Sequence, residues 1–124
     1  MCIRDSPYTS EWHLPKINAP QAWDSSLGTG VVVAVMDTGI NASHPDLVGK
    51  IASGGLNFVT LDANNNPTLD TSEDPKCGHG TPVSGTFAAA TNNAGKIAAV
   101  GWNTMVLPLK VATATPTALS LIHI

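Results

Sequence analysis

Two segments of this chain hold an acid and a histidine in settings that suit catalysis. Asp37 follows the apolar run 31–36 and precedes Thr38-Gly39, and His79 opens a stretch of small residues 42 positions later. In a Ser-His-Asp triad, the acid orients the imidazole through one ring nitrogen, and the other nitrogen takes the proton of a serine hydroxyl. The residue types and their order therefore make Asp37 and His79 candidates for the acid and the base of such a triad.

Each motif also has an ordinary structural explanation. Asp-Thr-Gly after a strand can form a turn in which the aspartate accepts a local backbone hydrogen bond. His-Gly-Thr can simply begin a helix. The two motifs together, in this order and with these flanking residues, favour the catalytic interpretation.

The surrounding pattern predicts an α/β sheet that would position both residues. The continuous run 31–36 is rich in valine, which is typical of a strand covered on both faces in a parallel sheet. Further strands are expected at 55–59 and 105–111, although Pro108 interrupts the second of these. In a doubly wound sheet, reactive groups gather at the carboxyl ends of the strands, which is where Asp37 lies.

The segments between these strands are expected to form helices that cover the sheet. Residues 79–90 predict a helix in which Pro82 is acceptable only in the first turn, where its missing N–H would have no partner. Residues 12–24 combine apolar anchors with prolines, which predicts a surface arm ending in a short helix with Pro20 in its first turn.

The composition argues against several classes of partner. The 124 residues are 43% hydrophobic, which is enough for one domain with a core. The formal net charge is −3 and the six Lys and Arg residues are scattered, so we expect no face for nucleic acid or anionic lipid. No apolar run reaches the roughly 18 residues of a membrane span, and no signal peptide is visible in this chain.

Flanking sequence on both sides of the two motifs agrees with a known family. The stretches 12–23, 39–47, 91–101 and 109–111, together with the Asp and His segments, resemble the subtilisin-like serine proteases, the subtilases. This resemblance extends from about residue 8 to about residue 111. It implies a seven-stranded, mostly parallel sheet and a secreted endopeptidase that acts on proteins or peptides. It also implies triad roles for Asp37 and His79, in the family's order Asp, His, Ser.

The third catalytic residue of that family has no counterpart here. The family's nucleophile lies in a Gly-Thr-Ser context, which none of the nine serines shares (Ser6, Ser10, Ser25, Ser26, Ser43, Ser53, Ser72, Ser84 and Ser120). Ser84 lies five residues after His79 on the same predicted helix, so the two side chains are not expected to face one substrate carbonyl. The family's oxyanion-hole Asn is also missing, and we expect this chain alone to be inactive.

The resemblance divides the chain into three parts. Residues 8–112 are expected to be the amino-terminal part of a subtilase catalytic domain, with an incomplete sheet. Residues 1–7 and 113–124 depart from the family pattern and resemble translated adapter sequence at the ends of short-read assemblies, so both are expected to be non-native. Pro82 departs as well, because the family often has a second histidine at that position.

Calcium is the cofactor that the resemblance implies, and no catalytic cofactor is expected. Many subtilases hold a structural calcium ion with residues that correspond to Asp46 and Asn93, and hard oxygen donors suit that ion. Residues 62–73 also place oxygen donors at EF-hand-like intervals, but Pro67 stands where such a loop needs glycine. A solvated acidic loop near the active site is the better prediction for that segment.

Two other functions stay open on the sequence alone. Asp-Thr-Gly after an apolar strand is also typical of aspartic proteases, in which two carboxylates share a proton and Asp37 would supply one. Against this, Ile40 follows the glycine where that family usually has Ala or Ser, and His79 would have no role. The other alternative is a subtilase-like module that binds without catalysis. Cys77, two residues before His79, could be half of a disulfide, which we favour slightly, or a free thiol near the site.

Overall fold

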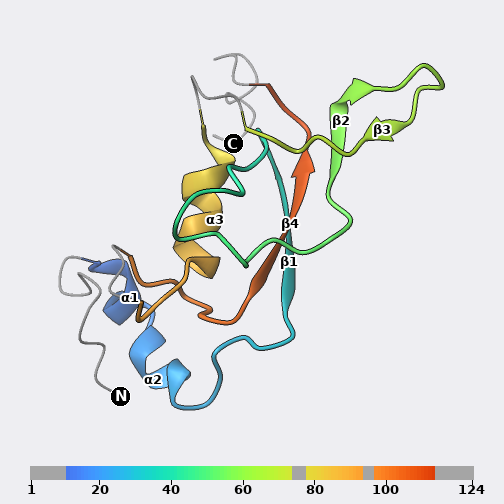
Figure 1. The fold of residues 1–124 in the computed structure, drawn as a ribbon. Helices are drawn as coiled ribbons and strands as arrows, with labels where there is room; N and C mark the ends of the chain where they lie inside the picture. The colour runs from blue at the N-terminus through green and yellow to red at the C-terminus, as the bar shows by residue number, and fades with distance from the viewer. Residues whose placement is uncertain (1–10, 74–77, 94–96, 114–124) are drawn as a thin grey trace.

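A computed structural model describes residues 11–73, 78–93 and 97–113 of the chain (Figure 1). Its elements, in chain order, are α1 (His13–Lys16), α2 (Ala19–Trp23), β1 (Val32–Asp37), β2 (Leu56–Leu61), β3 (Pro67–Thr68), α3 (Gly80–Ala88) and β4 (Met105–Lys110). The expected strands and the expected helix after His79 are all present, with ends that differ by a few residues. The end segments predicted to be non-native, 1–7 and most of 113–124, lie outside the described residues. Cys77 also lies outside them.

The strands form one mixed sheet in the order β1-β4-β2-β3. β4 lies between β1 and β2 and runs parallel to both, whereas the short β3 pairs antiparallel with β2. The register between β1 and β4 brings Asp37 opposite Lys110, so the two strands end together (Figure 1). The predicted fold class, a mostly parallel and incomplete α/β sheet, is confirmed.

Pro108 is accommodated inside a central strand. It pairs with Val35 of β1, and the ladder between β2 and β4 begins one residue later, at Leu56 and Leu109. A side chain on Gly55 would lie 2.8 Å from Cγ of Pro108, so the absence of one at residue 55 leaves room for the proline ring. The sheet therefore tolerates the missing N–H where β2 is only beginning to pair.

The two faces of β1 differ. Val33 and Val35 are half-buried beneath α3, but Val32, Ala34 and Met36 are exposed, and Met36 reaches 69% exposure. The prediction of a strand covered on both faces is wrong for the described residues. The described helix that packs on β1 and β4 is α3, and it lies on one side of these strands (Figure 1). The other face of β1 is therefore exposed in the described structure.

One apolar cluster holds α3 against the sheet. It consists of the buried side chains Ile40, Leu47, Ala88 and Val106, with Val35, Ile51 and Phe87 packed around them. Leu47 and Val106 are almost fully buried, and burial of such a side chain stabilises a fold by roughly 1.5–3 kcal/mol. Because Ile40 follows the Asp motif and Ala88 ends the His helix, this cluster helps to keep the two motifs together.

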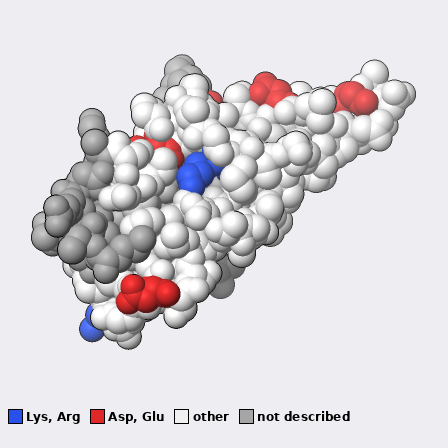
Figure 2. Space-filling model, turned by 60° about the horizontal axis from the view of Figure 1, so that its bottom comes forward, with Lys and Arg blue, Asp and Glu red and all other residues white. Residues whose placement is uncertain are grey.

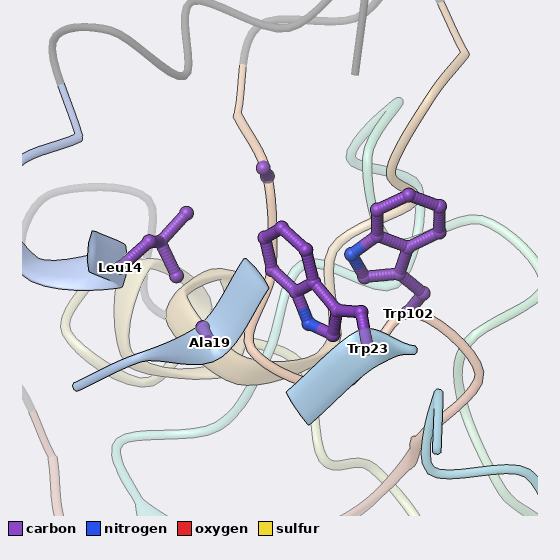
Figure 3. Close-up of a cluster of buried hydrophobic side chains, with 5 residues drawn as sticks. Leu14, Ala19, Trp23 and Trp102 are labelled. Atoms are coloured by element: carbon purple, nitrogen blue, oxygen red, sulfur yellow. The ribbon is translucent and has the colours of Figure 1, made fainter. Parts of the chain in front are cut away.

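The amino-terminal arm packs as two short helices rather than the single one expected. Leu14 of α1 and Ala19 and Trp23 of α2 share a second cluster with Ala98 and Trp102 (Figure 3). The rings of Trp23 and Trp102 are 5.1 Å apart between centroids, and Nε1 of Trp23 donates to the carbonyl of Val100 at 2.7 Å. Pro20 lies in the first turn of α2, as predicted. The arm therefore docks on the segment that follows α3.

The segment between β2 and β3 is an exposed turn built on Asp62. Its carboxylate accepts hydrogen bonds from the backbone N–H groups of Asn66 and Asn64, and these bonds lower the pKa of Asp62. Hydrogen bonds from Ser72 likewise lower the pKa of Asp70. Figure 2 shows the projecting arm of β2 and β3 with its acidic residues, on a face where Lys and Arg are sparse. The predicted solvated acidic loop is confirmed at Asp62 and Asp70, which are exposed, but not at Glu73, which is half-buried and hydrogen-bonded to Thr38 and Thr81.

None of the helices in the described part of the chain is long and apolar enough to cross a bilayer.

Candidate active site

Asp37 and His79 are in direct contact across the 42 residues that separate them. Nδ1 of His79 lies 2.9 Å from Oδ1 and 2.8 Å from Oδ2 of Asp37. The aspartate is 7% exposed, whereas the histidine side chain is 38% exposed. The buried carboxylate therefore faces one ring nitrogen, and the ring remains accessible from solvent.

The end of β1 fixes the carboxylate of Asp37. Its backbone carbonyl accepts a hydrogen bond from the N–H of Val111 at 2.9 Å, directly after β4. Its Oδ1 accepts from the N–H of Thr38 at 2.7 Å, inside the protein. Gly39 then turns the chain with φ at +101°, and a side chain there would lie 2.6 Å from the carbonyl oxygen of Thr71. Only glycine combines that φ with so close an approach of two backbones.

The start of α3 fixes His79. This residue is the N-cap of the helix, and the first helical residue, Gly80, packs directly on the turn after β1. A side chain on Gly80 would overlap the carbonyl oxygen of Gly39 and would lie 3.1 Å from Cβ of Asp37. Pro82 falls in the first turn of α3, as the sequence predicts. The glycines of the two motifs therefore let the helix start approach the strand end closely enough for the contact between Asp37 and His79.

This arrangement matches the acid and base half of a triad. Because Asp37 accepts from Nδ1–H, it holds the tautomer in which Nε2 is free of its own proton and can accept one. The same carboxylate stabilises the imidazolium that forms when Nε2 takes that proton. An imidazole held in this way can act as a general base, and the nucleophile would then have to come from another residue.

Ser84 does not supply that nucleophile. Its side chain is fully buried in α3, and its hydroxyl has no hydrogen-bond partner among the described residues. It therefore does not contact His79. The prediction from helical spacing agrees with this geometry.

Three residues that the sequence did not single out connect the two motifs. Oγ1 of Thr38 accepts hydrogen bonds from the N–H groups of His79 and Gly80, each at 3.2 Å. The carboxylate of Glu73 accepts from the N–H of Thr81 at 3.0 Å and from the hydroxyls of Thr38 and Thr81. The threonines stand inside the recognised motifs, which was a usable signal. Nothing in the spacing of Glu73 indicated its role.

The expected calcium ligands occupy adjoining segments. The backbone carbonyl of Asp46 accepts a hydrogen bond from Ala90 just after α3, three residues before Asn93. The side chain of Asp46 is mostly buried, and its Oδ2 lies 4.0 Å from Nδ1 of His44. Across the described part of the chain, no group of three or more His, Cys, Asp or Glu residues could hold a metal. These residues do not by themselves fit a calcium site, so the ion stays a prediction.

A hollow of about 800 Å³ opens beside the start of α3. Its walls are the segments 40–43 and 69–73, and Gly78 lies at its edge, next to His79. The hollow is lined by backbone and by both polar and apolar side chains. Gly78, the residue before His79, belongs to this lining, whereas His79 itself does not.

The geometry speaks against the aspartic-protease alternative. Such an enzyme needs Asp37 to share a proton with a second carboxylate. Here both oxygens of Asp37 lie against the imidazole of His79, and one of them also accepts from Thr38. The carboxylate is thus already engaged on the side where a second acid would have to approach.

Comparison with known proteins identifies the family of this chain. The profile of the subtilase family matches residues 28–123. Thermitase of Thermoactinomyces vulgaris is 39% identical over 109 residues, which cover 86% of this chain and 36% of that protein. An intracellular serine protease of Paenibacillus polymyxa is 46% identical over 86 residues, which cover 65% of this chain and 23% of that protein.

A solved structure has the same fold over most of the chain. A protease from Pseudoalteromonas arctica superimposes with a TM-score of 0.74 at 33% sequence identity, over 90% of this chain and 40% of that one. The chain thus spans well under half of the length of the proteins it matches. Because the family profile covers most of its residues, the chain belongs to the subtilase family, a family of serine peptidases.

Proposed function

We propose that this chain supplies the acid and the base of a serine endopeptidase. Asp37 orients His79, and Nε2 of His79 takes the proton of a serine hydroxyl that attacks the peptide carbonyl. The proton then passes from the imidazolium to the leaving amine. The single observation that carries this proposal is the contact of the Asp37 carboxylate with Nδ1 of His79.

The nucleophile and the oxyanion donor belong, in this proposal, to segments outside the sequence in hand. Residues 8–112 would form the amino-terminal part of the catalytic domain, and the fragment would be inactive alone. The share of its relatives that the chain covers, 36% of thermitase, supports this division. Without the nucleophile and the oxyanion donor, the fragment would have no group to form or to stabilise the tetrahedral intermediate.

The substrate class and the site of action are part of the same proposal. Protein or peptide substrates follow from the chemistry that a triad performs on an amide carbonyl. Relatives named as intracellular and as extracellular proteases both match the chain. We propose an extracellular parent enzyme, and the distribution of its activity between culture medium and cell lysate tests that choice.

The test begins with the complete gene, sequenced from the source DNA across both ends of this reading frame. Its product is then assayed on a denatured protein substrate with two inhibitors. A serine-directed phosphonate should abolish hydrolysis, whereas pepstatin should have no effect. Inhibition by pepstatin alone would favour the aspartic-protease alternative.

A third result is informative as well. A well-folded gene product without hydrolytic activity, and without a serine that reacts with the phosphonate, would reject the peptidase. The non-catalytic binding module would then be the better account.

A further inference from the structure

The loop that precedes α3 places a carboxylate between the two catalytic motifs. Glu73 is half-buried, and its oxygens reach residues on both sides of the contact between Asp37 and His79. Oε1 accepts from the N–H of Thr81 at 3.0 Å and from the hydroxyl of Thr38 at 3.2 Å. Oε2 accepts from the hydroxyl of Thr81. One side chain thus touches the turn after β1 and the first turn of α3.

The two threonine hydroxyls depend on this carboxylate as the acceptor of their protons. Oγ1 of Thr38 uses its lone pairs to accept from the N–H groups of His79 and Gly80. Oγ1 of Thr81 accepts from the N–H of Asn41 at 2.8 Å. Each hydroxyl also has one proton to donate. Both protons go to Glu73, which can accept them because an ionised carboxylate is an acceptor at both oxygens.

The surrounding backbone leaves room for the carboxylate. A side chain on Gly78 would lie 2.7 Å from Cδ of Glu73, so glycine immediately before His79 leaves room for the carboxylate in its observed position. His79 itself makes no side-chain hydrogen bond to its own helix as N-cap. Glu73 instead satisfies the N–H of Thr81, one of the helix-start donors that have no intrahelical partner.

We propose that Glu73 is a positioning residue for the catalytic pair. Its carboxylate holds the hydroxyls of Thr38 and Thr81, and through them it fixes the start of α3 against the end of β1. The imidazole of His79 is thereby held at Asp37. This inference rests on the proposed function, because it concerns how the general base of that reaction is placed.

Replacement of Glu73 by glutamine is the sharpest perturbation. The side chain keeps its size but has a single acceptor oxygen and a donating amide. The amide group of the glutamine would face the hydroxyl of either Thr38 or Thr81. The proton of that hydroxyl would then have no acceptor. Asp62→Asn is the matched control, because it makes the same charge change in the exposed turn between β2 and β3, and its remaining oxygen can still accept from the N–H groups of Asn64 and Asn66.

The experiment uses the product of the complete gene and two independent measurements. The first is kcat and KM for a peptide substrate. A displacement of about 1 Å can cost on the order of 100-fold in rate, so we expect Glu73→Gln to lower kcat by about 10- to 100-fold with KM nearly unchanged. The second is the proton NMR signal of Nδ1–H of His79, together with hydrogen exchange at the amide of Thr81. We expect that signal to weaken or vanish and the exchange to become at least about tenfold faster.

Asp62→Asn should leave all of these measurements unchanged. A Glu73→Gln protein with wild-type kcat, wild-type Nδ1–H signal and wild-type exchange would overturn the inference. If that variant does not fold, Thr81→Val and Thr81→Ser replace it: serine keeps the hydroxyl and should rescue the signal, whereas valine should lose it. Equal signals in these two variants would also overturn it.

Failure of the proposed function can be recognised separately. If the wild-type protein does not hydrolyse peptides, the peptidase proposal fails. The NMR signal and the exchange rate still decide whether Glu73 places His79.

Discussion

Two aspartates of this molecule have partners at very different distances along the chain. Asp62 is fully exposed and accepts from Asn64 and Asn66, at most four residues away. Asp37 is buried and is held against His79, 42 residues along the chain. The first arrangement shapes a turn and nothing beyond it. The second brings two distant elements into one site.

The hydrogen bonds of Asp62 shape a local turn, whereas the contact of Asp37 with His79 builds the candidate site. A turn such as that at Asp62 satisfies its own backbone, and its residues need no partner elsewhere. The site at Asp37 depends on the close approach of Gly39 and Gly80, on Thr38 and on Glu73. Substitutions at the site should therefore have far larger effects than matched substitutions in the turn.

The largest effect is expected for Asp37→Asn in the product of the complete gene. Asparagine keeps the shape but no longer favours the Nδ1–H tautomer, and loss of the acid in a triad costs about 10⁴-fold in kcat. The same chemical change at Asp62 should leave kcat within about twofold. Steady-state hydrolysis of a peptide measures both, and a comparable loss in the two variants would remove the distinction drawn above.

The next effect concerns stability and the close approach of α3 to β1. Gly80→Ala would place a methyl group on the carbonyl oxygen of Gly39, and overpacking of this kind should lower the free energy of unfolding by about 1–3 kcal/mol. Gly85→Ala is the control on the same helix, because its new methyl group would meet only the flexible end of Ile97, at 3.2 Å. Urea unfolding compares the two variants. Equal losses would show that the cost belongs to the helix and not to the junction.

A smaller loss is expected for Thr38→Val. The substitution leaves the N–H groups of His79 and Gly80 without their acceptor, and a buried unsatisfied donor costs roughly 1–3 kcal/mol, less where water can reach it. Because Glu73 and the rest of the cluster stay in place, we expect about 1 kcal/mol of unfolding free energy. Thr38→Ser keeps the hydroxyl and should recover most of it, and a serine variant as unstable as the valine variant would contradict this assignment.

The smallest effect is a local one at acid pH. Hydrogen bonds from Asn66 and Asn64 hold the pKa of Asp62 below its ordinary value of 3.8. A carboxyl with a depressed pKa stabilises the turn at pH values above its ordinary pKa, and that contribution is lost as the pH falls through the depressed value. The amide NMR shifts of Asn64 and Asn66 should therefore change only below about pH 3.8. A transition above that value would show that the hydrogen bonds do not favour the charged form.

Much of the fold could be predicted from the sequence because its signals are local. The apolar run 31–36, the small-residue segment after His79 and the later apolar run 105–111 each indicated their element directly. Coverage of β1 could not be predicted in the same way. Burial of a strand face depends on which other segments pack on it, and the composition of the strand does not contain that information.

The candidate site, like the fold, could be predicted in part. Asp37 and His79 stand in motifs whose order and flanks indicated a shared role, and the structure brings them together. The role of Glu73 could not be predicted, because it depends on two hydroxyls that accept hydrogen bonds from backbone N–H groups of other segments. Such a dependence exists only after the chain has folded.

The most direct test of the central claim is the rate at which a fluorophosphonate labels the product of the complete gene, read by intact mass. The account predicts one covalent adduct on a serine in the wild-type protein and a rate at least about 10³-fold lower in His79→Ala, because the serine then has no base. An adduct that forms equally fast without His79 would contradict the assignment of Asp37 and His79 as the acid and base of a triad.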